Sequence, residues 1–568
     1  MKIVLRLSVL LMLITALSTS CKKKVPKQTT HIPKTAVFVA SLNSKSLQNK
    51  LIKSQVTIEN LFKTLTSDND SAFDKGRKEW EELKNSGIDL DEDIYISFDQ
   101  KGGGMAMGKG SGVFTMMGTL DDAAKLEAYV KRKKPTASVQ KEKDYSYVLD
   151  GDNMVAWAKD LVIAMSYQKS YSGGMQFDSA TQSYNLNKPQ DVNSTNDLKA
   201  EMAAYINRKE ETSVTSLSEF RDLMQDRSDA SMWVNSASSV ENMPIPLPKV
   251  KELFENSITA ATLNFEEGKV VVNSKSYSSK PLGDLLSKYS GPSLDLGLVE
   301  KYPSNAINGF MVAAFNPEFF TGLVNYLEVG GMVDGFLTKF MGTNYTLKEL
   351  IKVFKGDLAF IASDYGPNKG QPAMLPMKLL FNATVGDKTQ LNRVMDKLVA
   401  QQLLVKNGNQ YLLNPAMRKM GMYVSIDEKY ILAGTDSTVI AQYRAQNGTA
   451  ALNKSVVNDL KGKSVGGYVD FEKIMAGIPA DTKFDSVLVS AKQTFKDLTL
   501  YSDQYTGKFT QGHFELRTKN EKENSLTSLV NFMAVAGQSI KQQQARNKEM
   551  MSGMGVDSTA VSTDTTVQ

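Results

Sequence analysis

Two stretches of the chain share one pattern of apolar and polar positions. Residues 114–131 (FTMMGTLDDAAKLEAYVK) and 379–396 (LLFNATVGDKTQLNRVMD) each contain an apolar run, a threonine, an aspartate and then apolar residues three and four positions apart. Asp122 and Asp387 occupy equivalent positions, 265 residues apart. The pattern predicts a strand, a turn in which the aspartate caps a helix, and an amphipathic helix that covers the strand.

Further landmarks recur in the same order along the chain. An opening strand, a strand after a charged turn, a hairpin and a final pair of strands each occur twice: 37–51 and 307–327, 91–99 and 354–364, 144–166 and 409–435, and 259–278 and 496–520. We therefore predict an α+β fold made of two tandem, diverged copies, residues 32–280 and 300–520. In each copy, a mostly antiparallel sheet is expected to carry helices on one face.

The first copy contains an additional polar segment. The offset between equivalent residues falls from 265 to 235 at Trp233 and Tyr468, so this copy is 30 residues longer. Residues 171–197 are rich in Ser, Asn and Gly and have no hydrophobic period, which is typical of a long loop. After the second copy, residues 525–550 are predicted to form an amphipathic helix and residues 552–568 a disordered tail.

The N-terminus has the features of a secretory signal. Residues 1–20 combine Lys2 and Arg6, a short apolar run and small residues, and this run is too short to span a bilayer comfortably. Cys21, the only cysteine, follows directly in LSTSC, which resembles a bacterial lipobox except that Leu lies four residues before the Cys instead of three. We expect Cys21 to be acylated and residues 21–31 to be a lipidated tether to the membrane.

The tether, the opening I-P-x-x-A-x-x-V-x-x-L at residues 32–42 and the repeated strand–helix landmarks together resemble a known family. They are similar to the Bacteroidota envelope lipoproteins of the domain of unknown function 4836 family, over nearly all of the mature chain. The resemblance implies an envelope lipoprotein and provides no catalytic residue. Surface-exported lipoproteins of Bacteroidota tend to carry acidic residues after the lipidated cysteine, so the lysines after Cys21 favour an outer-membrane protein that faces the periplasm.

Composition argues against several chemistries. The net charge of +5 is small for 568 residues, and the sequence has no long basic stripe interleaved with aromatic residues. Nucleic acid is therefore not a favoured partner. A single cysteine allows neither an intrachain disulfide nor a cysteine-based metal site. The two histidines, His31 in the tether and His513 on a predicted strand, are far apart in sequence. We therefore predict no metal, no cofactor and no enzymatic activity.

Two motifs imitate ligand-binding sites. Residues 103–110 match a phosphate-binding loop, but Gly110 replaces the required Ser or Thr and a strand, not a helix, is expected to follow. Alternating aspartates at 89–93 resemble a calcium loop, but Ile94 replaces the required glycine and Gln100 the bidentate glutamate. Turns between strands explain both segments.

The helices of the second copy are unusually apolar. Gly330 and Gly331 separate two predicted helices that carry Phe319, Phe320 and Tyr326 on the first and Phe336 and Phe340 on the second. A buried core and an exposed surface for a partner or an acyl ligand are both consistent with this pattern.

Three functions are consistent with the sequence. The first is a membrane-anchored, non-catalytic binding or accessory module whose partner is an envelope protein, glycan or lipid. The second is a carboxylate-dependent hydrolase of cell-envelope glycans or peptides, which requires two facing carboxylates. The third is a periplasmic lipid carrier, which requires an enclosed apolar cavity between sheet and helices.

Overall fold

The computed structural model describes residues 25–54, 70–102, 111–168, 175–178, 183–186, 194–236, 248–341, 345–366, 377–418, 421–478 and 485–553. The predicted signal peptide, Cys21, the glycine-rich residues 103–110 and the tail from residue 554 lie outside these residues. Among the helices of the described segments, none combines the length and the apolar character that crossing a bilayer requires.

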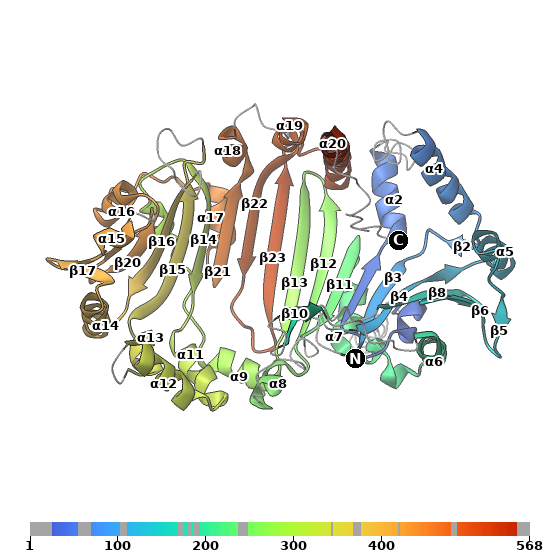
Figure 1. Ribbon diagram of the computed structural model, residues 1–568, viewed down its shortest axis with the longest axis horizontal. Helices are drawn as coiled ribbons and strands as arrows, with labels where there is room; N and C mark the ends of the chain where they lie inside the picture. The colour runs from blue at the N-terminus through green and yellow to red at the C-terminus, as the bar shows by residue number, and fades with distance from the viewer. Residues whose placement is uncertain are drawn as a thin grey trace, which may run out of the picture.

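One antiparallel sheet runs through the whole body (Figure 1). Across its first half the strands are, from edge to centre, β5 (Gln140–Lys141), β6 (Ser146–Asp150), β7 (Asn153–Ala158), β8 (Leu161–Gln168), β4 (Ser111–Leu120), β3 (Ile94–Gly102), β1 (Phe38–Leu42), β11 (Ala230–Asn235), β12 (Ile258–Glu266) and β13 (Lys269–Tyr277). The short strand β2 (Ile88–Asp89) also pairs with β4. A mixed fold with a large open antiparallel sheet was predicted and is confirmed.

The second half has its strands in the corresponding order. From edge to centre they are β17 (Leu404–Asn407), β18 (Gln410–Leu413), β19 (Tyr423–Ile426), β20 (Tyr430–Gly434), β16 (Lys378–Val385), β15 (Phe354–Ser363), β14 (Ile307–Ala314), β21 (Val465–Asp470), β22 (Phe495–Ser502) and β23 (Phe509–Thr518). β13 and β23 pair antiparallel and so join the two halves. A tandem duplication would produce this arrangement; the duplication itself stays a prediction.

The helices follow the strands along the chain. The first half contains η1 (Lys27–His31), α2 (Ser44–Lys53), α4 (Asp70–Lys84), α5 (Ala123–Lys133), α6 (Ser194–Ile206), α7 (Ser218–Gln225), α8 (Pro248–Phe254) and α9 (Lys280–Lys288). The second contains α10 (Gly297–Glu300), α11 (Glu318–Tyr326), α12 (Gly330–Met341), α13 (Leu347–Ile351), α14 (Lys388–Ala400), α15 (Pro415–Arg418), α16 (Ser437–Arg444), α17 (Lys454–Leu460), α18 (Phe471–Ala476), α19 (Asp485–Thr494) and α20 (Ser525–Gly553).

The predicted strand–helix landmark is present in both halves. The Asp122 side chain accepts hydrogen bonds from the first backbone N–H groups of α5, and Asp387 does the same for α14. Each aspartate satisfies helix donors that would otherwise have no partner.

Helices pack on both faces of the sheet, which corrects the prediction of helices on one face. We call the face covered by α5 and α14 the front face. There Leu126 and Val130 of α5 pack on Val162 and Trp157, and α14 packs in the same way through residues that include Leu391. The two halves each need a second helical layer because the opposite side of their strands is also apolar.

The back face contains the two larger cores. In the first half, α6 and α7 cover it, and the fully buried Trp233 contacts Phe220 of α7 with ring centroids 5.5 Å apart. In the second half, α16 and α17 cover it through residues that include Ile440 and Leu460, which pack on Phe310.

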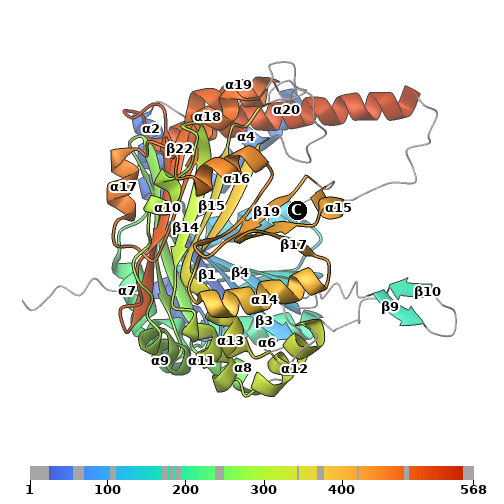
Figure 2. The same cartoon turned by 90° about the vertical axis from the view of Figure 1, so that its left-hand side faces the viewer.

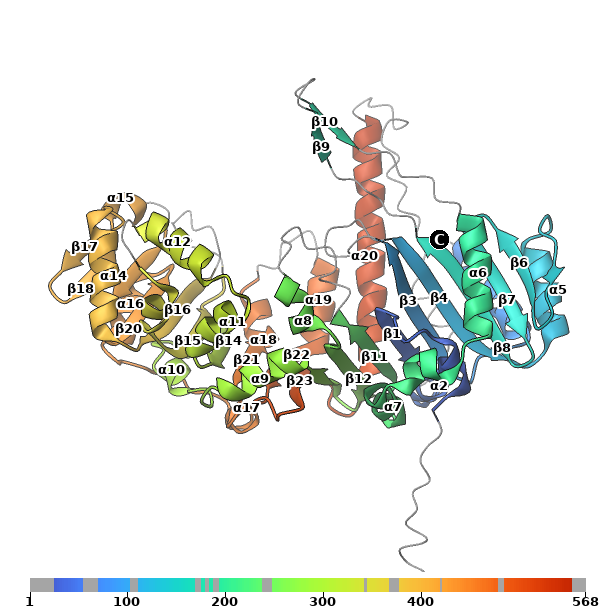
Figure 3. The same ribbon diagram turned by 90° about the horizontal axis from the view of Figure 1, so that it is seen from below.

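None of the described helices covers the centre of the front face in Figure 1, where β22, β23, β13 and β12 face the viewer. Figure 2 shows α17 behind these strands and α14 in front of them. In Figure 3 the central strands lie lowest, the two ends of the sheet rise on either side, and α20 projects in the same direction.

The polar segment 171–197 is only partly within the described residues. β9 (Met175–Asp178) and β10 (Ser183–Leu186) pair as a separate two-stranded ribbon, and α6 begins at Ser194. A long loop or excursion was predicted for this segment. β9 and β10 form a short ribbon within it, and each of them contains an aromatic residue, a type that favours strands.

Candidate partner-binding surfaces

One face of α12 is apolar and exposed. Met332, Phe336 and Phe340 lie four residues apart, on one side of the helix, and their side chains are 63%, 68% and 60% exposed. The rings of Phe336 and Phe340 stack with centroids 6.4 Å apart. We call these three residues the α12 stripe. The alternative interpretation, a buried core, is therefore wrong for these three side chains.

Local hydrogen bonds hold α12 in place. The Asp334 carboxylate accepts a hydrogen bond from the Leu347 backbone N–H at 2.8 Å, and the Gln401 amide donates to the Phe340 carbonyl at 3.2 Å. These contacts attach α12 to α13 and to the end of α14. The α12 stripe is therefore presented by a fixed helix.

The predicted surface extends onto α11 only in part. Phe320 is 45% exposed and contacts half-buried Phe319, with ring centroids 6.0 Å apart. Tyr326 is also half-buried; its hydroxyl donates to Glu252 at 2.8 Å, and the Lys249 ammonium lies 5.5 Å from its ring centroid. Partial desolvation and the Glu252 carboxylate raise the pKa of Tyr326 to about 12. Of the five predicted residues, Phe320, Phe336 and Phe340 are exposed.

A second apolar surface was not predicted from the sequence. A row of cross-strand neighbours crosses the front face from β12 to β15. Its members are Leu263, Val272, Phe514, Leu500, Gly467, Met311 and Phe360. Met311 is 51% exposed and Phe360 46%; Gly467 is buried, and the other four residues of the row are half-buried. We call this set the front row.

The back face of the same central strands is polar. His513 and Asn273 lie opposite each other with Nδ1 and Oδ1 2.8 Å apart, and the Lys269 ammonium contacts Glu515 at 2.9 Å. Arg517 binds Asp497 through two hydrogen bonds of 2.6 and 2.9 Å. His513, which sequence analysis left without a role, therefore belongs to the seam between the halves.

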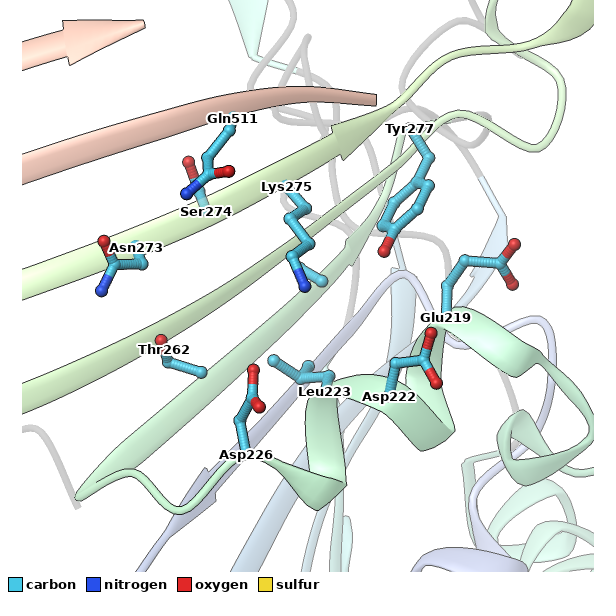
Figure 4. Close-up of a pocket in the computed structure, with 11 residues that line it drawn as sticks. Glu219, Asp222, Leu223, Asp226, Thr262, Asn273, Ser274, Lys275, Tyr277 and Gln511 are labelled. Carbon is cyan, nitrogen blue, oxygen red and sulfur yellow. The ribbon is translucent and has the colours of Figure 1, made fainter. Parts of the chain in front are cut away.

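A small acidic cavity lies beneath α7 (Figure 4). Its volume is about 40 Å³, close to the share of one water molecule, and Lys275 and Tyr277 of β13 form part of its wall. Glu219, Asp222 and Asp226 line it, and all three belong to α7 or the residue after it. Burial and these acids raise the pKa of Tyr277. All three acidic residues come from this one segment, and the alternative of a carboxylate-dependent hydrolase stays a prediction.

A larger cavity of about 320 Å³ lies between α17, α18 and the strands β14 and β21. Asn305, Asn453, Asp470 and Lys473 contribute to its lining, and the Lys473 ammonium donates to the Asn305 carbonyl at 3.2 Å. Amide and charged groups would be desolvated by an acyl chain, so this lining does not suit one.

The remaining sequence motifs have structural roles or lie outside the described residues. Cys21 and residues 103–110 are outside them. The Asp89 carboxylate accepts a hydrogen bond from the Asp91 backbone N–H, as in a turn, and His31 contacts the Tyr205 carbonyl at 3.0 Å. Within the described part of the chain, no group of three His, Cys, Asp or Glu residues is arranged to hold a metal ion.

Fold and surfaces together define an α+β protein with exposed apolar side chains on a fixed helix and on an open sheet face. The sequence matches the family described as "Domain of unknown function (DUF4836)" over residues 29–526, and the chain belongs to this family. No curated protein matches the sequence.

Two solved structures are similar in part. They are crystal forms IV and I of TP0453, with 9% and 10% sequence identity and TM-scores of 0.24 and 0.22. The first match covers 46% of this chain and 83% of that chain, and the second covers 47% and 86%. Neither likeness bears on function.

Proposed function

We propose that this protein is a non-catalytic lipoprotein of the bacterial envelope, anchored through Cys21, that binds another envelope component through the α12 stripe. The observation that carries the proposal is the exposure of Phe336 and Phe340, each at 60% or more. Fixed aromatic side chains without cover are typical of recognition surfaces. Complete burial of such a side chain stabilises a complex by about 1.5–3 kcal/mol.

The tether supports a location beside the membrane. Five residues separate Cys21 from Lys27, where η1 begins, and an extended chain from one to the other spans about 20 Å. An acyl group on Cys21 would therefore keep the folded body next to the bilayer. The lysines that follow Cys21 support the periplasmic face of the outer membrane as the site.

Cell fractionation tests the anchor. We expect the protein to sediment with membranes and Cys21→Ser to move it to the soluble fraction, because the acyl chains provide the attachment. Mass spectrometry of the mature N-terminus should find diacylglycerol on Cys21. An unmodified Cys21 with residues 1–20 still attached would contradict the proposal.

Site-specific crosslinking in living cells tests the α12 stripe. A photoreactive phenylalanine at position 336 or 340 should form adducts with one envelope component, since both positions are exposed. The same group at Met533, which is 52% exposed on α20, is the matched control and should not form that adduct. Equal adducts at all three positions, or none at 336 and 340, would remove the α12 stripe as the binding surface.

A further inference from the structure

We propose that the open centre of the front face binds an amphipathic α-helix of a partner protein. This surface is separate from the α12 stripe and lies on the strands, not on a helix. The proposal rests on the front row, on the helices that already cover the same sheet face, and on the size and charge of the uncovered area.

The front row is continuous across seven strands. Each member lies directly opposite the next in the antiparallel register, from Leu263 on β12 to Phe360 on β15. Residues directly opposite each other point to the same face, so the row forms one apolar band. The band continues on the first half through Met232 and Met116, which are 40% and 43% exposed.

The central strands place their apolar side chains on the face that no described helix covers, which is unusual. An antiparallel sheet with one solvated face normally places its polar side chains there. At the centre of this sheet the polar residues, including His513 and Glu515, occupy the back face, and Phe514 between them faces the front. The central strands therefore direct their apolar side towards the uncovered region.

The same sheet face shows what kind of element covers it. At one end α5 packs apolar side chains on the front face, and at the other end α14 does the same. In each half, one strand carries a front-face residue beside the open centre and continues into the part under the helix. On β4 these positions are Met116, which is exposed, and Leu120; on β16 they are Phe381, which is half-buried, and Val385. A third amphipathic helix would complete the layer between them.

The dimensions of the area also fit a helix. Seven strands have six spacings of about 4.8 Å, which gives a length of about 29 Å. Two residues along a strand advance by about 6.8 Å, so the front row and its two flanking rows cover about 14 Å. A helix of about 20 residues is about 30 Å long and 10–12 Å wide. A single acyl chain would leave most of this width uncovered.

The area contains almost no charge. Its front-face positions on β12, β13, β21 and β23 are apolar residues, Gly, Ser or Thr, and Lys496, at the end of β22, pairs with Glu521. Such a surface complements the apolar stripe of a helix and leaves the partner's polar side towards water. Methionine side chains such as Met311 adapt their shape to different partners.

A model peptide tests the proposal. The probe is an 18-residue leucine–lysine peptide with leucines at helical spacing, and the control peptide has the same composition with leucine and lysine alternating. The protein is the mature chain from residue 22, since the described fold begins after it. We expect the helical peptide to bind at least tenfold more tightly than the alternating one and to become helical by circular dichroism.

Protein variants locate the binding site. Met311→Asp combined with Phe360→Asp should weaken binding of the helical peptide at least tenfold. Met533→Asp is the matched control, because Met533 and Met311 are 52% and 51% exposed, and it should change affinity less than twofold. Thermal unfolding checks that both proteins are folded.

Four results would overturn the proposal. They are equal binding of the two peptides, unchanged binding to the front-face variant, one-to-one binding of palmitate that the same variant abolishes, and self-association that the same variant abolishes. The third would identify an acyl ligand and the fourth a second copy of this chain. Phe336→Asp should leave peptide binding unchanged. A negative result for the front face can therefore be distinguished from a negative result for the α12 stripe.

Discussion

At the seam between the halves, the ionisation of one carboxylate depends on the side chains around it. Glu515 on β23 is half-buried; it contacts Lys269 at 2.9 Å, and His513 Nε2 lies 3.9 Å from its carboxylate. The nearby His513 ring, the hydrogen bond and charge of Lys269, and the charge of Arg517 lower the pKa of Glu515 to about 2. Because β23 pairs with β13 across the seam, this carboxylate contributes to the contact between the halves.

Acid should therefore weaken the fold through Glu515. A carboxyl group whose folded pKa lies below the ordinary value of 4.5 stabilises the folded state above pH 4.5, and this stabilisation is lost as the pH falls towards 2. After discounting for solvent exposure, we expect about 1–2 kcal/mol from Glu515 at pH 7. Glu515→Gln should lower the free energy of unfolding in urea by this amount at pH 7 and by much less at pH 2, where about half of the Glu515 carboxyl groups are protonated.

Glu521 provides the control for that measurement. It pairs with Lys496 at 2.7 Å, and its pKa is also lowered, but the group is fully exposed. Glu521→Gln should leave the free energy of unfolding nearly unchanged at both pH values. A constant difference between Glu515→Gln and the natural protein from pH 7 to pH 2 would contradict the assignment of the pKa shift.

At the scale of elements, α12 and α14 show why exposure cannot be deduced from periodicity. Both helices carry apolar residues three and four positions apart. α14 packs Leu391 into a core where it is 1% exposed, whereas α12 leaves Phe336 68% exposed. The pattern predicts an apolar stripe in each case. Whether a strand lies beneath the stripe depends on distant parts of the chain.

The two helices should differ in their response to a charge. Phe336→Asp combined with Phe340→Asp removes only exposed area and one ring contact, so we expect the free energy of unfolding to fall by less than about 1 kcal/mol. Leu391→Asp places an unpaired carboxylate in a core and should cost more than about 3 kcal/mol. Urea unfolding followed by circular dichroism measures both. A loss of more than 3 kcal/mol in the α12 variant would show that the stripe supports the fold.

At the scale of the whole molecule, contacts between distant segments determine the architecture. The antiparallel strands and both capping aspartates were predictable, because alternation and N-caps are local signals. The front row was not, since Val272 and Phe514 become neighbours only when the two halves pair. Sequence analysis predicted both strands but not that their apolar sides meet on an open face.

The two halves are also joined by the C-terminal segment. The Asn524 amide donates to the Phe265 carbonyl at 2.9 Å, and the Ser525 hydroxyl donates to the Lys269 carbonyl at 2.8 Å. α20, which follows the second half in sequence, contacts α2, β12 and β13 of the first half. The covalent connection through α9 and α10 is therefore not the only link between the halves.

Cleavage of that connection should leave the body assembled. A protease site inserted between Pro292 and Ser293, which are both exposed, can be cut after folding. We expect the two fragments to elute together in size-exclusion chromatography, because nine residue pairs join β13 to β23 and α20 packs across the seam. Truncation after residue 523, which removes α20, should allow the cut fragments to separate at lower urea concentration than in the full chain. Separation of the fragments of the full chain in the absence of denaturant would show that the continuous sheet does not hold the halves together.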